Sequence, residues 1–339
     1  MTHRPLATRA LAALAAVALS GGLAACSSDG PDASPSGELR QFTVVLDWTP
    51  NTNHAGMYLA KAEGWYEDAG LDVTFVEPGE TSSLQVVAAG RADVAVSVAE
   101  ELLPARAAGL PVRSVAAIIE HNTSSLVSLA DDDITEPADL AGATYGGFGG
   151  QLEEAILDAL ITCDGGDPDE LELVDVGEAD YRVGLERDQY DVVWIFDGWD
   201  GIRLAQAEVD TNRIPFIDHT DCIPDWYTPL LATSEDVEAE RAEDLAAFVD
   251  ATSRGYQEAM RAPSAAADAL LTAAPDLDAD LVAESAEYLS TRYATDPEAW
   301  GRQDPEVWER FAEFLDEAEM LTDDVDVDDA FTDDYLPTS

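Results

Sequence analysis

Polar and aromatic residues follow the first predicted strand, residues 42–46, in a segment that leads into a predicted helix. Trp48 offers a flat indole that can stack on a ring, while Asn53 and His54 can donate or accept hydrogen bonds. Pro50 and the asparagines around it are typical of a turn. Each residue alone has a structural explanation, Trp48 as a packing residue and His54 as a structural histidine. Together at a strand end they favour the binding of a small ligand.

Two later strand ends carry further candidates. Glu178 follows the predicted strand 171–176, where a carboxylate can bind a donor on a ligand or only stabilise a helix N-terminus. Trp194 and Trp199 flank the end of the predicted strand 191–196, and Tyr227 precedes a short strand at 230–232. These aromatic side chains either stack on a planar ligand or pack in the core.

A glycine-rich loop, residues 144–150, follows another short strand. It lacks the Lys-Ser/Thr pair of a P-loop and the spacing of a dinucleotide-binding fingerprint. Its glycines favour a close approach of backbone amides to a small ligand. The sequence also lacks G-x-S-x-G, H-E-x-x-H and C-x-x-C motifs, so no catalytic residue, cofactor or metal site is expected. The acidic stretch 323–334 lacks the glycine and glutamate of an EF-hand and is interpreted as a solvated extension.

Strands and helices alternate in two series, which predicts an α/β protein with two largely parallel sheets. Only helical patterns remain after residue 236, and we expect this tail to return to the first series. The predicted lobes are 41–128 with 229–339, and 129–228. Because ligands of such sheets bind beyond the carboxyl ends of the strands, we expect a cleft between the lobes.

Acidic residues dominate the composition. Asp and Glu number 70 against 17 Lys and Arg, for a net charge of -53. Such a field repels phosphate backbones, which excludes nucleic acid as a partner. The hydrophobic fraction of 46% is enough for a folded core, and no apolar run is long enough to span a bilayer.

The N-terminus reads as a secretory signal over residues 1–25, with two arginines before an apolar run. Leu-Ala-Ala-Cys, ending at Cys26, resembles the lipobox of bacterial lipoproteins; the alternative is an ordinary signal peptide and a chance cysteine. An acylated Cys26 would anchor the protein at the extracytoplasmic face of the cell membrane through a flexible tether, residues 26–40. Cys163 and Cys222 either form a disulfide or remain free.

Several segments resemble the substrate-binding lipoproteins of ABC importers, in the thiamine-pyrimidine (formylaminopyrimidine) class. They include LDWTPNTNHAGMYLAKAEGWYEDAGLDV, AAGRADVAVSVAEELLPARAAGLPV, TYGGFGG, VGEADYRVGLERDQYDVVWIFDGW and WYTPLLATSE, and together they span most of residues 42–336. The resemblance implies a type II periplasmic binding protein fold, an ABC permease and a small heteroaromatic ligand as partners, and a monomer.

Carried over residue by residue, the resemblance implies a ligand pocket formed by Trp48, Asn53, His54, Glu100, His121, Tyr145, Gly147, Glu178, Trp194, Trp199 and Tyr227. Asp197 stands where the family pattern has an aromatic residue, so one stacking surface would be missing.

Two other functions compete. Alkanesulfonates or nitrate are ligands of related binding proteins, but anions need donors or positive charge, and the pocket motifs contain no Lys or Arg. A pyrimidine-synthase-like enzyme of this fold would need a cysteine-rich iron motif, which this chain lacks. We therefore expect a binding protein and not an enzyme.

Overall fold

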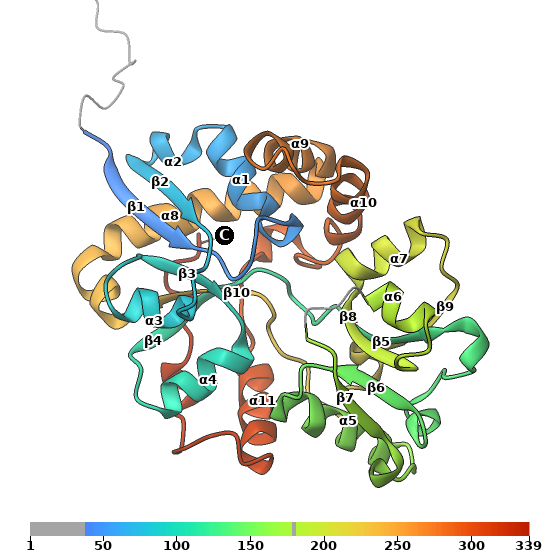
Figure 1. Ribbon diagram of the computed structural model, residues 1–339. Coiled ribbons are helices and arrows are strands. Elements are labelled where there is room, and N and C mark those ends of the chain that lie inside the picture. The colour runs from blue at the N-terminus through green and yellow to red at the C-terminus, as the bar shows by residue number, and fades with distance from the viewer. Residues whose placement is uncertain (1–37, 178–180, 339) are drawn as a thin grey trace, which may run out of the picture. The chain divides into compact units, whose positions relative to one another are not determined.

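The computed structural model describes residues 38–177 and 181–338, which form two five-stranded sheets with helices on their faces (Figure 1). The signal peptide 1–25, Cys26, nearly all of the tether 26–40, and Glu178 lie outside the described residues.

The first sheet has the strand order β2-β1-β3-β10-β4. β1 pairs in parallel with β2 and β3, while β10 is antiparallel to both of its neighbours because it enters on return from the second sheet. The strands are β1 (Arg40–Val45), β2 (Leu71–Val76), β3 (Val94–Ser97), β4 (Val112–Ala117) and β10 (Leu230–Ser234).

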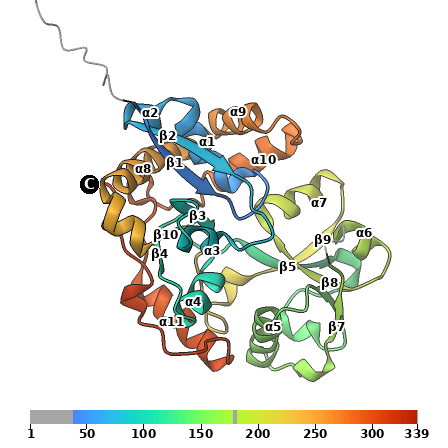
Figure 2. The same ribbon diagram turned by 60° about the vertical axis from the view of Figure 1, so that its left-hand side comes forward.

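Helices cover both faces of the first sheet, and the pleat divides its side chains between them. Val44 and Val94 pack toward a first group of helices, and Val45 and Ala95 pack toward a second group on the opposite face. Figures 1 and 2 both show helices of the first group beside β1 and β2. The first group comprises α1 (Ala55–Ala62), α2 (Trp65–Asp68), α8 (Glu235–Arg261), α9 (Pro263–Ala273) and α10 (Ala279–Leu289), and the second α3 (Ser83–Ala88), α4 (Ala99–Ala107) and α11 (Pro305–Glu317).

The second sheet repeats this plan with the order β7-β6-β8-β5-β9. β5 is antiparallel to its neighbours, as β10 is in the first sheet. The strands are β5 (Ser124–Leu129), β6 (Thr144–Gly147), β7 (Glu172–Asp175), β8 (Val192–Phe196) and β9 (Thr211–Pro215). One face packs on α5 (Gln151–Cys163), and the other on α6 (Tyr181–Glu186) and α7 (Ile202–Gln206).

Two segments connect the sheets, and we call them the first crossover, residues 118–123, and the second crossover, residues 216–229. Since β5 begins at Ser124 and belongs to the second sheet, the chain changes sheet a few residues earlier than the predicted boundary at 128. The return to the first sheet comes directly before Leu230 in β10.

The acidic C-terminal stretch packs on the protein, contrary to the prediction of a solvated extension. Ser114 in β4 donates its N–H to Ala330 O at 2.9 Å and accepts from Thr332 N–H at 2.9 Å. Ala330 is buried. The tail therefore pairs with β4, the outermost strand of the first sheet, and covers an edge that would otherwise expose backbone groups.

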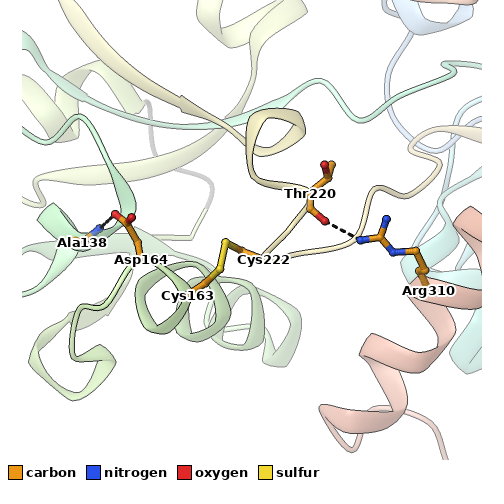
Figure 3. Close-up of a disulfide and its surroundings, with 6 residues drawn as sticks. All are labelled: Ala138, Cys163, Asp164, Thr220, Cys222 and Arg310. Carbon is orange, nitrogen blue, oxygen red and sulfur yellow. Dashed lines mark hydrogen bonds between the residues drawn. A yellow bond between two sulfur atoms is a disulfide. The ribbon is translucent and has the colours of Figure 1, made fainter.

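A disulfide joins Cys163, the last residue of α5, to Cys222 in the second crossover, with 5.6 Å between the two Cα atoms (Figure 3). This settles a question that the sequence left open. Among the described residues, no helix has both the length and the apolar character needed to cross a membrane.

Candidate functional site

The strand registers bring the carboxyl ends of both sheets to the crossovers. In the first sheet, Leu230 at the start of β10 lies opposite Ser97 and Ala117, the last residues of β3 and β4. In the second, Ser124 at the start of β5 lies opposite Phe196, the last residue of β8. The strand order reverses direction between β1 and β3 in the first sheet and between β6 and β8 in the second. Open α/β sheets bind ligands beyond such topological switch points.

The loop after β1 is braced by His54. Its Nδ1 accepts from Asn51 N–H at 3.2 Å, so its Nε2 carries the hydrogen and donates to Asp47 Oδ1 at 2.8 Å. His54 is fully buried. The predicted ligand histidine therefore positions the loop, and Asp47 with it. The Asn53 backbone is held by Asn51 Oδ1 and by the hydroxyl of Tyr256. Trp48 in the same loop is 58% exposed.

Glu100 lies in the first turn of α4, which begins directly beyond β3. The helix is fixed to the second crossover because Ala99 N–H donates to Tyr227 O at 3.0 Å. Burial raises the pKa of Glu100 to about 8, and the carboxylates of Glu101 and Asp47 add to the rise. The structure thus brings Glu100 close to the loop after β1.

The glycine loop after β6 is organised by Glu153, which the sequence reading missed. Its carboxylate accepts from Phe148 N–H and Gly150 N–H at 3.0 Å each, and from the Tyr145 hydroxyl at 2.9 Å. Gly147 is required because a Cβ there would lie 2.4 Å from the Tyr145 ring. Glu153 is the third residue of α5 and accepts from the N–H of the N-cap Gly150, which is the glutamate half of a capping box, and a glutamate at this position is the feature that could have revealed this role.

His121 ties the two crossovers together. Its Nδ1 lies 2.7 Å from Asp225 Oδ2, and this hydrogen bond raises the pKa of His121. Asp225 Oδ1 also accepts from the N–H groups of Asn122 and Trp226, at 2.9 and 3.0 Å. His121 was expected to contact a ligand, and in the structure it pairs with Asp225.

Three predicted stacking residues have packing contacts in the structure. Trp194 meets Phe216 edge-on, with 4.7 Å between ring centroids. Trp199 packs partly buried in a cluster with Tyr58 and Leu270 of the first lobe. Tyr227 is buried, and its hydroxyl accepts from Asp304 N–H at 2.7 Å.

The exposed aromatic side chains at strand ends are Trp48, Phe148 and Phe196. Phe148 directly follows β6 and is 55% exposed, and Phe196 ends β8 and is 43% exposed. The sequence reading named neither phenylalanine. Phe148 directly follows β6, Phe196 is the last residue of β8, and both lie near turn-forming glycines. This position is the feature that could have identified them.

Asp197 is buried and fully engaged. Its carboxylate accepts from Ser125 Oγ at 2.7 Å and pairs with Arg213 Nη1 at 2.9 Å. Burial raises its pKa, although Ser125 and Arg213 oppose the rise. Asp197 therefore holds the turn 197–201 in place, at a position where the family pattern has an aromatic residue.

A cavity of about 430 Å³ lies among α6, α7, α10 and the turn 197–201 that follows β8. None of the predicted site residues lines it; the lining residues are Tyr181, Arg182, Asp200, Arg203, Leu204, Gln206, Ala207, Asp278 and Leu281.

A family model described as "NMT1/THI5 like" matches residues 51–266, from the loop after β1 to α9. The chain belongs to the NMT1/THI5-like family. This match includes both crossovers and the strand ends described above, except for β1 itself and the residues that directly follow it.

Relatives of this NMT1/THI5-like protein have different printed functions. The formylaminopyrimidine-binding protein of Halalkalibacterium halodurans is 31% identical over 91% of this chain and 94% of its own. The riboflavin-binding protein RibY of Chloroflexus aurantiacus is 27% identical over 91% of this chain and 88% of its own. Pyrimidine phosphate synthases are also among the relatives.

Solved structures confirm the fold of this family member. The periplasmic aliphatic sulphonate-binding protein SsuA of Escherichia coli superimposes with a TM-score of 0.68, at 16% identity, over 87% of this chain and 92% of its own. The two sheets with an antiparallel fourth strand are therefore those of a type II periplasmic binding protein, as the sequence predicted.

Proposed function

We propose that this protein is an extracytoplasmic solute-binding protein that captures a thiamine pyrimidine precursor and delivers it to an ABC permease. The observation that carries the proposal is the combination of exposed aromatic rings with carboxyl groups at the strand ends. Trp48, Phe148 and Phe196 offer flat faces, Asp47 directly precedes Trp48, and the Asp47 carboxylate lies close enough to Glu100 to raise its pKa. Such a site suits a planar base that carries hydrogen-bond donors. The similarity to a formylaminopyrimidine-binding protein supports the same ligand class.

An alkanesulfonate or nitrate ligand is the alternative, and the loop after β6 argues against it. Backbone N–H groups at the start of α5 are the donors that would bind an anion. In this structure the Glu153 carboxylate accepts from the N–H groups of Phe148 and Gly150. A ligand anion would have to displace the Glu153 carboxylate from these two N–H groups.

We further propose that the protein binds its ligand without catalysing a reaction. Cys163 and Cys222 are joined in a disulfide, so the described residues contain no free thiol for a cysteine-ligated iron. Glu178 lies outside the described residues, and its predicted role in ligand binding stays a proposal.

Formylaminopyrimidine is expected to raise the melting temperature of the purified protein and to quench its tryptophan fluorescence, whereas ethanesulfonate leaves both unchanged. Stacking on Trp48 is worth about 0.5–1.5 kcal/mol, so Trp48→Ala should weaken binding about two- to tenfold. Titration calorimetry measures the affinities.

Trp65→Ala is the matched control, because Trp65 packs under Arg254, with 3.9 Å from the guanidinium to the ring centroid, and not at a strand end. A protein that responds to ethanesulfonate and ignores formylaminopyrimidine would contradict the proposed ligand. Equal losses in the Trp48 and Trp65 variants would contradict the role of Trp48.

We also propose that Cys26 carries the lipid anchor, on the basis of the lipobox-like sequence and the polar tether. Cys26→Ala should move the protein from the membrane fraction to the soluble fraction of the producing cells, because an acyl chain contributes about 0.8 kcal/mol per buried methylene. Immunoblotting of fractionated cells measures the shift. Ser27→Ala is the control and should stay with the membrane, and a Cys26 variant that stays there too would refute the anchor.

A further inference from the structure

Buried polar atoms without a hydrogen-bond partner gather around the site. Within the described residues, six such atoms lie at the end of β3, at the start of α4, in β8 or in the crossovers and the first residue of β5: Ser97 Oγ, Glu100 Oε2, Asn122 Nδ2, Ser124 Oγ, Trp194 Nε1 and Trp226 Nε1. An unpaired buried polar group costs about 1–3 kcal/mol, and native proteins contain few of them. A seventh atom, Trp308 Nε1, lies in α11, so six of the seven in the described part of the chain belong to the strand ends and crossovers or to β8.

Three of these atoms come from segments that are fastened to each other. The bond from Ala99 N–H to Tyr227 O holds the start of α4 against the second crossover, which places Glu100 beside Trp226. The Trp226 indole N–H opposes the rise of the Glu100 pKa as a hydrogen-bond donor toward its carboxyl, although the contact does not meet the geometry of a full hydrogen bond. Ser97 ends β3 three residues before Glu100, and both Ser97 and Trp226 are 1% exposed.

Negative charge surrounds Glu100. Asp47 faces it from the loop after β1 and Glu101 from its own helix, while His54 is engaged with Asp47. Burial and these carboxylates together hold the pKa of Glu100 at about 8, so the side chain is a neutral carboxylic acid at pH 7. A carboxylic acid presents an O–H donor beside a carbonyl acceptor.

We propose that Ser97, Glu100 and Trp226 form a buried polar subsite in which the carboxylic acid of Glu100 pairs with an aminopyrimidine edge of the ligand. This inference rests on the proposed function and adds the group that recognises the ring. The Glu100 O–H donates to a ring nitrogen, and its carbonyl oxygen accepts from the neighbouring exocyclic amine. The Trp226 N–H and the Ser97 hydroxyl then supply a second donor and a group that can donate or accept.

Two substitutions of Glu100 separate this pairing from a merely structural role. Glu100→Leu removes both donor and acceptor, and should weaken formylaminopyrimidine about ten- to hundredfold at pH 7. Glu100→Gln keeps an N–H donor beside a carbonyl and should bind about as well as the unaltered protein. Above pH 8 the unaltered protein should lose affinity, because Glu100 loses its donor proton. The Glu100→Gln variant should keep its affinity above pH 8.

Glu240→Leu and Glu240→Gln are the controls, since Glu240 is an exposed glutamate of α8 and is not one of the groups that raise the pKa of Glu100. Calorimetric titrations with formylaminopyrimidine, cytosine and ethanesulfonate at pH 7 and pH 9 give the affinities, and thermal melts establish that each variant folds. Where Glu100→Leu fails to fold, the pH profiles of the Gln variant and the unaltered protein decide.

The outcomes distinguish this subsite from the proposed function. Equal effects at Glu100 and Glu240, or an alkaline loss that persists in Glu100→Gln, overturn the subsite, while binding of formylaminopyrimidine still supports the function. Binding of cytosine alone, with the Glu100 dependence above, overturns the proposed ligand and supports the subsite. Binding of ethanesulfonate alone, or of no probe, overturns both.

Discussion

Replacing both Cys163 and Cys222 with alanine is expected to lower the free energy of unfolding by about 4 kcal/mol, as chain-entropy arguments give for a loop of this length. The two cysteines are 59 residues apart in sequence. Reopening this loop frees the unfolded chain more than the folded one, which shifts the equilibrium toward unfolding.

The folded state also depends on this link, because Cys222 lies in the segment that returns the chain to the first sheet. Figure 3 shows the segment held from two sides, by the disulfide to α5 and by Arg310 of α11, which donates to Thr220 O at 2.7 Å. Without the disulfide, α5 and the second crossover lose the covalent link between Cys163 and Cys222. Their contact then depends on non-covalent packing within the second lobe.

Urea denaturation of the double variant and of the unaltered protein measures the difference. The unaltered protein in a reductant strong enough to open the disulfide should match the double variant, which separates the cross-link from any effect of the alanines. A loss below about 1 kcal/mol would show that the denatured chain gains little freedom when the loop opens.

The sequence predicted the fold because each strand and helix has its own periodicity. Residue patterns predict a helix at 55–62, a strand at 71–76 and a helix at 151–162; the structure has the first two with these bounds and extends the third by one residue as α5. β9 escaped prediction because four of its five residues are not buried, so a strand at the edge of the sheet shows no apolar run. The packed C-terminal stretch escaped because its acidic composition conceals the few residues, such as Ala330, that it buries.

The strand ends at which we propose the site were predicted to within one residue, because turn residues mark where each strand stops. Which aromatic residues face outward depends on the pleat and on the partner helices, which the sequence does not show. Tyr227 is therefore in the core, while Phe196 is exposed. For the same reason the sequence does not show that His54 forms a hydrogen bond with Asp47, which lies seven residues earlier in the chain.

Arg213→Met is expected to destabilise the protein by about 3 kcal/mol, because it removes the cation from a partly buried ion pair. Arg213 contacts Asp197 at 2.9 Å and donates to Gly201 O at 3.0 Å, so it holds both ends of the turn after β8. The Asp197 side chain is 11% exposed. In the variant its charge keeps the hydrogen bond from Ser125 and the attraction of the Arg292 cation.

The loss should depend on pH with a definite sign. Burial already holds the pKa of Asp197 above its ordinary value, and removal of Arg213 raises it further. A carboxyl whose pKa is higher in the folded protein binds more protons there, so stability falls as the pH rises above the ordinary aspartate value of about 3.9. The deficit of Arg213→Met should therefore be larger at pH 8 than at pH 5.

Two comparisons make this result specific to the ion pair. The double variant Asp197→Asn with Arg213→Met has no charge to bury, so it should recover part of the loss, and its deficit should change little between pH 5 and pH 8. Arg261→Met is the surface control: Arg261 is 53% exposed and 4.0 Å from Glu258, a pair worth about 0.5 kcal/mol or less. Urea unfolding of the unaltered protein and the three variants at both pH values gives the eight free energies. A deficit that is the same at both pH values, or that the added Asp197→Asn leaves unchanged, would assign the role of Arg213 to packing against Gly201 and not to its charge.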